Sequence, residues 1–459
     1  MARLENDLGR DDVRRLVLRI AIPSMLAQFV SVLYNIVDRM YIGNIPGTGS
    51  LALAGVGVCG PILTMVGSVA FLIGVGGSPL MSIRMGKGEM DAARRILANC
   101  FLMLCAASAL LVLLVFPFRL PMLRLFGASE AVLPYADSYF SAYLTGTLFS
   151  LLSVGMNQFI ICQGYARMGM FSVLCGAVAN IILDPIFIFV LDLGVSGAAI
   201  ATVLSQLLSC IFVLRFLFFG EIPVKITFGG YSWRTVRRVL AIGFTPFVII
   251  AIDNIMIIVM NAVLQRYGGA EGDFLITCAT IAQSFMLVVT MPLGGISGGT
   301  QTILGYNYGA GRPDRVQRAQ RWIFLLCVCY TALLFLLARI CGPLFVRLFT
   351  SDAVVAEKAF WAIKVCTLSI IPLGLQYEIV DGFTAIGKVG LSLPLSLFRK
   401  LVYFLAVFLL PLFLGAEAAF FAEPVSDVLG PLVSALIYCL AIKKILYRKR
   451  GAREAGVRP

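Results

Sequence analysis

Long apolar runs dominate this chain, and short polar segments rich in Gly, Pro and Arg separate them. Runs such as FLIGVGGSPLMSI and LVYFLAVFLLPLFL lack the alternation of apolar and polar positions that marks the strands of a membrane β-barrel. A helix needs about 20 mainly apolar residues to cross a bilayer, and the segments around these runs are long enough. The pattern predicts an all-α polytopic membrane protein with about twelve transmembrane helices.

The polar segments divide the chain into candidate spans and domains. The predicted spans cover 14–42, 51–81, 93–117, 131–154, 169–191, 195–219, 238–266, 273–303, 317–341, 354–385, 391–414 and 417–445. The first span is too long for a signal peptide and lacks a small-residue cleavage site, so we expect it to stay uncleaved. The longest polar connection near the middle contains Gly, Pro and basic residues and is interpreted as a cytoplasmic linker. The predicted domains are an N-terminal bundle at 1–219, this linker at 220–237, a C-terminal bundle at 238–446 and a basic tail at 447–459.

Composition and charge placement agree with a membrane protein. Of the 459 residues 60% are hydrophobic and only 13% are charged, roughly half the charge of an ordinary soluble domain. The net charge of +13 concentrates in alternate connections, whereas 43–50 and 192–197 carry no Lys or Arg. This distribution follows the positive-inside rule and predicts that both termini are cytoplasmic. The basic charge therefore reports topology and contact with anionic lipid, not nucleic-acid binding.

Several kinds of chemistry are disfavoured by what the sequence lacks. It has no histidine, so histidine-ligated metal sites and a Ser-His-Asp mechanism are excluded. Its 12 cysteines include no CxxC pair, and we interpret them as small buried apolar residues. GAGRPD at 309–314 lacks the GK[ST] ending of a phosphate loop. We therefore expect no enzyme activity, no cofactor and no ATPase subunit.

The two halves of the sequence match each other at one constant offset, without gaps. The shift that places Pro23 on Pro246 also places Gly164 on Gly387. The same shift matches Gly86, Gly88 and Asp91 to Gly309, Gly311 and Asp314, and Arg124-Leu125-Phe126 to Arg347-Leu348-Phe349. Two bundles of six helices would enter from the same side, giving a parallel repeat with a pseudo-two-fold axis along the membrane normal. Such proteins usually bind substrate near the midplane between the halves and expose it to each side in turn.

Three stretches resemble the multidrug and toxic compound extrusion (MATE) transporters. They are IPSMLAQFVSVLYNIVDRMYIGNI with the following LALAGVG, ANIILDPIFIFVLDLGVSGAAIATVLSQ, and PLGGISGGTQTILGYNYGAGRPDRVQRAQR. The resemblance extends over nearly the whole chain and is greatest to the bacterial branch that carries Asp in spans one and five. It implies secondary active export of bulky, often cationic or amphipathic compounds, driven by inward proton or sodium flow.

Two aspartates in the first half are candidates for ion coupling. Asp184 lies about fifteen residues into an apolar span, with Asn180 at i−4 and Pro185 after it. An intramembrane carboxyl is costly, and desolvation favours its neutral form, so it can take up and release a proton. The alternative is an aspartate that only links helices through hydrogen bonds. Asp38 lies near the outer end of its span, where Tyr34 could donate to it or Arg39 could pair with it at the interface.

The family resemblance assigns these residues to a common site. It implies that Tyr34, Asp38, Asn180, Asp184 and Thr202 belong to a polar network in the N-terminal bundle, with Tyr139 and Asn157 as further members. It also implies that protonation of Asp38 or Asp184 from outside repacks the first span and lowers the affinity for substrate. Polar candidates for substrate contact are Gln28, Gln163, Gln206 and Gln283, with hydrogen bonds between helices as the alternative.

The second half offers a possible second cation site. Asp253 lies in the seventh span, and Glu378 and Asp381 share a face of the tenth at i and i+3. Carboxylate oxygens around a cavity suit a small hard cation. The alternative for Glu378 is an ion pair with Arg399 or Lys400, two cations that are themselves costly in a membrane. Glu423 and Asp427 are competing partners for those cations.

These features favour a multidrug exporter that exchanges small molecules for protons, with sodium as the alternative ion. A flippase for lipid-linked oligosaccharides or peptidoglycan precursors is the alternative function, because Arg399 and Lys400 could bind pyrophosphate. The expected location is the bacterial cytoplasmic (inner) membrane, and the expected partners are drug-like small molecules and the bilayer, with the protein as a monomer.

Overall fold

A computed structural model describes residues 6–350 and 352–454, and within these ranges the regular secondary structure is helical throughout. Parts of the predicted N-terminal bundle (1–5) and basic tail (455–459) lie outside the described residues. The first half contains α1 Val13–Gly43, α2 Gly49–Gly86, α3 Met90–Val115, α4 Arg119–Leu125, α5 Leu133–Thr145, α6 Thr147–Ile161, α7 Ala166–Pro185, η1 Ile186–Val190 and α8 Gly194–Phe219. The second half contains α9 Trp233–Gly268, η2 Gly269–Glu271, α10 Gly272–Gly309, α11 Pro313–Ile340, α12 Gly342–Arg347, α13 Ala353–Cys366, α14 Ile370–Ala385, α15 Val389–Leu414, η3 Ala416–Phe421 and α16 Ala422–Glu454.

The predicted all-α membrane fold is confirmed, with two of the predicted spans, 131–154 and 354–385, differing in form. Among the described residues, 10 helices are long and apolar enough to cross a membrane, and a bent pair, α5 with α6, raises the number to 11. The two helices of this pair meet at 57°. The predicted span 354–385 is instead divided into α13 and α14 by a turn at 367–369. It contains Lys358, Lys364, Glu378 and Asp381, so its continuous apolar stretches are shorter than those of the other spans.

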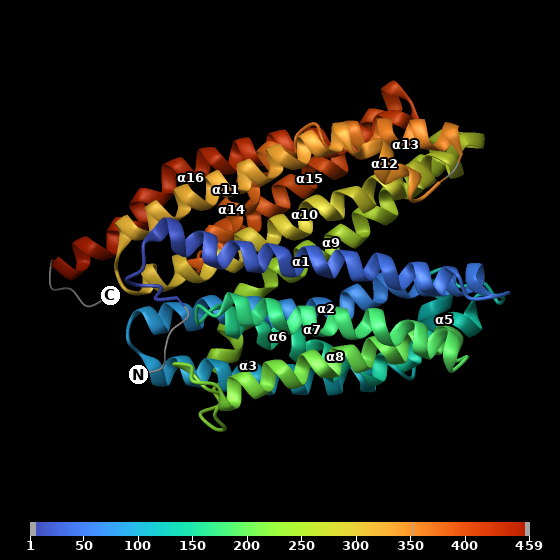
Figure 1. Cartoon of the computed structure of the whole chain (residues 1–459). Helices are drawn as coiled ribbons and strands as arrows, with labels where there is room; N and C mark the ends of the chain where they lie inside the picture. Colours follow the sequence, from blue (N-terminus) through green and yellow to red (C-terminus); the bar gives the residue numbers. More distant parts are fainter. Residues whose placement is uncertain (1–5, 351, 455–459) are drawn as a thin grey trace. The chain divides into compact units, whose positions relative to one another are not determined.

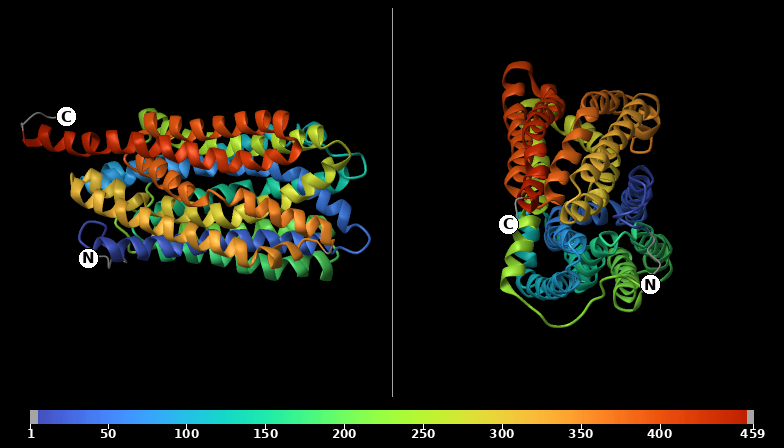
Figure 2. Two further views of the ribbon diagram at one scale, coloured as in Figure 1. Left: turned by 90° about the horizontal axis from the view of Figure 1, so that it is seen from above. Right: turned by 90° about the vertical axis from the view of Figure 1, so that its left-hand side faces the viewer.

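The chain divides into two compact units. Unit 1 comprises the N-terminal segment up to Arg10 with Ile22–Ile250, and unit 2 comprises Asp11–Ala21 with Ala251 to the C-terminus. Within each unit the long helices run side by side, as Figure 1 shows along their length and the right view of Figure 2 shows end-on. Two helices change unit along their length, α1 next to its internal Pro23 and α9 a few residues after its internal Pro246. Proline removes a backbone hydrogen bond and bends a helix, so each change lies near a weak point.

The internal repeat is visible in the helix boundaries. The shift that places Pro23 on Pro246 also places both ends of α2 on those of α10, and the starts of α3, α4 and α7 on those of α11, α12 and α15. The units also share packing partners, since α2 contacts α3, α5 and α6, and α10 contacts α11, α13 and α14. One bundle design is therefore built twice.

Turn residues repeat their backbone conformation as well. Gly164 and Gly387 have φ of 93° and 72°, a left-handed conformation that glycine adopts without steric cost. Asp192, at φ 50°, is matched by Gly415 at 85°, and it is the one non-glycine residue with positive φ in the described part of the chain. The repeated glycines thus mark helix ends that need this conformation.

The connection after α8 is bound to unit 1. The backbone N–H of Val224 donates to Gln163 Oε1 at 2.9 Å, and Ser232 N donates to Asn99 Oδ1 at 3.0 Å. We call the connection at 220–232 the strap. Its residues Ile222, Val224 and Ile226 are buried, so every second side chain of this part packs inward. The polar connection predicted at 220–237 is therefore ordered up to Ser232 and then enters α9.

Glycines let the unit 1 helices approach closely. A Cβ on Gly74 in α2 would lie 2.8 Å from the carbonyl oxygen of Gly155 in α6. A Cβ on Gly243 in α9 would lie only 1.7 Å from the Leu72 oxygen of α2. Both distances are below any real Cβ contact, so backbone meets backbone at these points.

Candidate functional site

Asp184 is fully buried at the end of α7, where the helix changes form. Pro185 follows it and cannot donate a backbone hydrogen bond, and the next five residues form a π-helical turn. Asn180, one turn earlier, donates its Nδ2 to Asp184 Oδ1 at 3.0 Å and lies 3.4 Å from Thr202 Oγ1 of α8. The predicted i−4 pairing of Asn180 and Asp184 is thus present and extends to a neighbouring helix.

Asp38 of α1 completes a carboxyl pair with Asp184. Asp38 is buried, and the two carboxyl groups lie within hydrogen-bonding reach of each other. Asp38 Oδ1 and Asp184 Oδ2 have no hydrogen-bond partner in the described residues. Two carboxyl groups can bond to each other only when one of them carries a proton, so this arrangement can hold a proton away from water.

Aromatic hydroxyl groups surround the pair. Tyr34 and Tyr139 both lie within electrostatic range of the two carboxyl groups. Tyr139 stacks on Tyr143, with ring centroids 6.4 Å apart, and the Tyr143 hydroxyl accepts a hydrogen bond from Gln206 Nε2 at 3.1 Å. Tyr143 was not among the predicted site residues, although its spacing of four from Tyr139 could have indicated it.

Asn157 lies apart from this cluster. Its Oδ1 accepts a hydrogen bond from Ser172 Oγ at 3.2 Å, near the start of α7. Ser172 precedes Asp184 by twelve residues, or about 18 Å along the helix at about 1.5 Å per residue. The structure therefore brings together six of the predicted first-half residues and leaves Asn157 in a separate contact, where it links α6 and α7. The six are Tyr34, Asp38, Tyr139, Asn180, Asp184 and Thr202.

The buried cations of unit 2 are paired with two of its acidic residues. Arg399 Nη1 donates to Asp427 Oδ1 at 2.7 Å, and Lys400 Nζ pairs with Asp253 Oδ1. Glu423 lies within electrostatic range of both cations. The ion pair considered for Glu378 with Arg399 or Lys400 is therefore not present, because both cations have other partners. Asp253 pairs with Lys400 and does not form a common site with Glu378 and Asp381.

Glu378 and Asp381 form a second carboxyl cluster on α14. Asp381 Oδ2 accepts a hydrogen bond from Ser297 Oγ at 2.5 Å, and Gln301 also bonds to this carboxyl group. Glu378 is fully buried beside Asp381, and neither of its carboxyl oxygens has a hydrogen-bond partner in the described residues. The side chain of Gln320 lies nearby and accepts a hydrogen bond from Tyr438 at 2.9 Å. A group of three or more acidic, Cys or His side chains suited to a metal ion is absent from the described residues.

The cluster at Glu378 and Asp381 lies where the first half of the chain has a close contact between two glycines. The shift that relates the two halves places Gly74 and Gly155, which form the close contact in unit 1, on Ser297 and Glu378. One copy of the helix junction is therefore backbone against backbone, whereas the other contains two carboxyl groups with polar neighbours.

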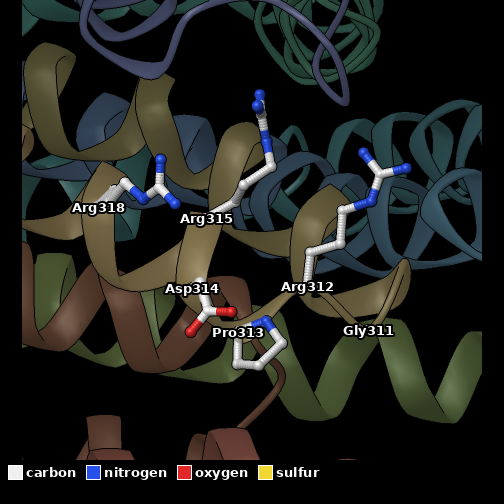
Figure 3. Close-up of a pocket in the computed structure, with 6 residues that line it drawn as sticks. All are labelled: Gly311, Arg312, Pro313, Asp314, Arg315 and Arg318. Atoms are coloured by element: carbon white, nitrogen blue, oxygen red, sulfur yellow. The ribbon is translucent and has the colours of Figure 1, made fainter.

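A basic cavity lies at the start of α11. It has a volume of about 440 Å³, and Figure 3 shows the guanidinium groups on one side of the turn and the Asp314 carboxylate turned away from them. Tyr447 donates a hydrogen bond to Asp314 Oδ1 at 2.7 Å. The lining residues are Gly311, Arg312, Pro313, Asp314, Arg315 and Arg318. A cavity of this charge suits an anionic group at a membrane surface.

The corresponding loop of unit 1 has a different charge balance. Glu89 is the residue that the repeat places on Arg312, and it pairs with Arg84. This hydrogen bond from Arg84 lowers the pKa of the Glu89 carboxyl group below its usual range. The first loop therefore compensates its basic charge locally, whereas the second presents arginines to the cavity.

A duplicated bundle of long apolar helices, with buried carboxyl groups in both copies, defines a multi-pass membrane protein with an internal repeat. The model of the MatE family matches residues 23–186 and 248–410, once in each half and over more than half of the chain. The protein belongs to this family of multidrug efflux transporters, so the sequence resemblance is confirmed at the family level.

Relatives and solved structures agree with this assignment. The multidrug export protein MepA of Staphylococcus aureus (strain MRSA252) is 21% identical over 433 residues, 94% of each chain. A protein named FAD transporter from Shewanella oneidensis is 25% identical over 429 residues, 91% of this chain and 92% of its own. An outward-facing multidrug resistance MATE transporter superposes with a TM-score of 0.89 at 22% identity, covering 95% of this chain and 98% of its own. A MATE structure in a bent conformation gives 0.88 at 23% identity, covering 97% and 98%.

Proposed function

We propose that the protein is a secondary active exporter that exchanges cationic or amphipathic small molecules for inward-moving protons by alternating access. The observation that carries this proposal is the buried pair of Asp38 and Asp184, whose carboxyl groups lie within hydrogen-bonding reach of each other and can share a proton. A charged group inside a membrane costs several kcal/mol and marks ion or substrate pathways by default. The expected substrates are drug-like, as for the MepA relative.

The pair offers a direct way to convert proton binding into a change of shape. When both carboxyl groups are ionised they repel each other, and entry of one proton allows a hydrogen bond between α1 and α7. α7 ends in Pro185 and a π-helical turn directly after Asp184, so it can bend beside the pair, whereas α1 can bend at Pro23, farther along its length. Protonation from outside would repack α1, lower the affinity for substrate and release it outward.

The cluster at Glu378 and Asp381 is the candidate second cation site. Its immediate neighbours Ser297 and Gln301 are bonded to Asp381, so few oxygens are left to surround a metal ion, and a proton suits the cluster better than sodium. Asp253, also predicted for this site, is engaged with Lys400. Sodium remains the alternative coupling ion, with Glu378 and Asp381 as its ligands.

The remaining parts of the proposal concern location and substrate. We place both termini in the cytoplasm of a bacterial inner membrane and expect a monomer that needs no nucleotide-binding subunit. The flippase alternative loses support because Arg399 and Lys400, its candidate pyrophosphate ligands, already have carboxylate partners. Export of an anionic dinucleotide, suggested by the name of the Shewanella relative, would meet the same obstacle at these two cations.

The test is dye efflux from proteoliposomes, with a pH gradient and a sodium gradient imposed separately. Efflux driven by the pH gradient and abolished by Asp184→Asn supports proton coupling through the pair. Efflux that requires sodium and is abolished only by Glu378→Gln contradicts that assignment and places coupling in unit 2. If neither gradient moves a cationic dye, export of cations is wrong and labelled lipid-linked sugars are the next substrate.

A further inference from the structure

The ion pair between Lys400 and Asp253 is exposed on one side only. The Lys400 side chain is 4% exposed, whereas that of Asp253 is 47% exposed. Asp253 lies in the middle of a candidate span of 39 residues, Trp233–Glu271. A carboxylate at that depth cannot face hydrocarbon without a large cost, so the exposed side of Asp253 faces water. The pair therefore borders an aqueous path inside the membrane.

The neighbouring ion pair has the opposite character. Arg399 is 12% exposed and Asp427 is completely buried. The Arg399 side chain also fills the space beside Gly430, where a Cβ would lie 2.7 Å from Arg399 Cγ. This inner pair is fixed by packing, so Asp253 is the better placed of the two aspartates to meet a ligand from solution.

The charges around the ion pair of Lys400 and Asp253 favour a cationic ligand. Three carboxyl groups, those of Asp253, Glu423 and Asp427, lie in electrostatic range of only two cations, Arg399 and Lys400. When all five are ionised, the cluster carries an excess of one negative charge. Tyr377 and Tyr403 lie in electrostatic range of the same cluster and add a hydroxyl group each. A positively charged group approaching from the exposed side thus meets an attractive field.

We propose that Asp253 binds the cationic group of the transported compound, and that Lys400 is an exchangeable partner which the compound displaces. This inference rests on the proposed export function and assigns its charge selectivity to one carboxylate. While the site is empty, Lys400 keeps Asp253 from being an unpaired charge in the membrane. Because Lys400 competes for Asp253, it also weakens binding and lets the compound leave.

The test compares two ions of the same shape and opposite charge, tetraphenylphosphonium and tetraphenylborate. Equilibrium binding of each is measured on the detergent-purified full chain, with protein-free micelles as the blank. Lys400→Gln removes the competitor and should raise tetraphenylphosphonium affinity at least threefold. Asp253→Asn should lower it at least tenfold and strengthen tetraphenylborate binding, because Lys400 is left without its carboxylate.

The double variant Asp253→Asn/Lys400→Gln removes both charges and leaves none unpaired. It should bind tetraphenylphosphonium at least tenfold more weakly than the wild type, with tetraphenylborate affinity within twofold. If Lys400→Gln does not fold, this double variant alone tests whether Asp253 binds the cation. The matched control is Asp137→Asn, which breaks the 2.8 Å ion pair with Arg119 in unit 1 and should change neither affinity by more than twofold.

A purely structural pair gives a different pattern. Lys400→Gln would then lower tetraphenylphosphonium affinity or leave it unchanged, and the double variant would keep its preference for the cation; either result overturns the inference. Failure of the export function is recognised separately. In that case the wild type binds tetraphenylphosphonium, but neither a pH gradient nor a sodium gradient drives its efflux from proteoliposomes.

Discussion

Asn180 donates a hydrogen bond to Asp184 one helical turn later, at 3.0 Å between Nδ2 and Oδ1. This bond occupies Oδ1 of the carboxyl group, and Oδ2 has no partner in the described residues. The carboxyl group of Asp38 lies within hydrogen-bonding reach of the same side chain. The amide thus orients the carboxyl pair on which the proposed proton coupling depends. Asn180 acts as a positioning residue, because it reaches the proton only through Asp184.

Replacing Asn180 by Leu should impair coupling. The change leaves a buried carboxyl oxygen without its donor, at a cost of about 1–3 kcal/mol. We expect the rate of dye efflux driven by a pH gradient to fall about tenfold, which corresponds to about 1.4 kcal/mol. The control is Asn157→Leu, the same substitution at the contact with Ser172 in another part of unit 1. Equal losses of efflux in both variants would contradict a special role for Asn180.

Gly243 should be intolerant of any side chain. A Cβ at this position would lie 1.7 Å from the Leu72 carbonyl oxygen, so Gly243→Val must push α9 and α2 apart. Overpacking typically costs about 1–3 kcal/mol, and a backbone contact leaves little room to relax. We expect a large loss of monodisperse protein in size-exclusion chromatography and a lower melting temperature in detergent. Gly57→Val serves as the control, since a Cβ there meets no atom within 4 Å; similar behaviour of the two variants would argue against the close approach.

The connection after α8 should loosen when Gln163 is shortened. Gln163→Ala removes the acceptor for the Val224 N–H and leaves that buried group unsatisfied, at about 1–3 kcal/mol. We expect trypsin to cleave at the exposed Lys225 about tenfold faster than in the wild type, measured by limited proteolysis. Gln283→Ala in unit 2 is the control. Unchanged cleavage in the Gln163 variant would show that the strap is held by its buried apolar residues alone.

Breaking the inner ion pair of unit 2 should destabilise the protein strongly. Asp427→Asn removes the carboxylate that is hydrogen-bonded to Arg399 inside the bundle, and breaking a buried ion pair in this way costs about 3–5 kcal/mol. The double variant Arg399→Met/Asp427→Leu removes both charges and should recover most of the melting temperature. Asp91→Asn, at a pair whose aspartate side chain is 85% exposed, should lower it little. A double variant as unstable as Asp427→Asn would show that packing, not the broken ion pair, causes the loss.

Local sequence signals were enough to predict the fold class and the repeat. Gly88 and Gly311 end equivalent helices with φ of 78° and 72°, and such turn glycines are encoded position by position. The two breaks within spans were not predicted, because they depend on neighbouring helices. At Gly146, between α5 and α6, a Cβ would lie 2.4 Å from Val203 of α8, a contact that the sequence does not reveal.

The candidate site shows the same division between local and long-range information. The contact of Asn180 with Asp184 follows from helical spacing and was predicted. The choice of partners among Asp253, Glu378, Arg399 and Lys400 was left open, since it depends on how separate helices are rotated against one another. Spacing along one helix therefore predicts contacts within it, whereas ion pairs between helices require the structure.

The replacement of Gly74 and Gly155 by Ser297 and Glu378 at the repeated junction bears on the history of the molecule. Duplication supplied two copies of one backbone, and substitutions at this junction then gave them different chemistry. The protein can be regarded as a heterodimer whose subunits share a chain. A substitution in the carboxyl cluster of one half need not disturb the glycine packing of the other, so the halves can specialise independently.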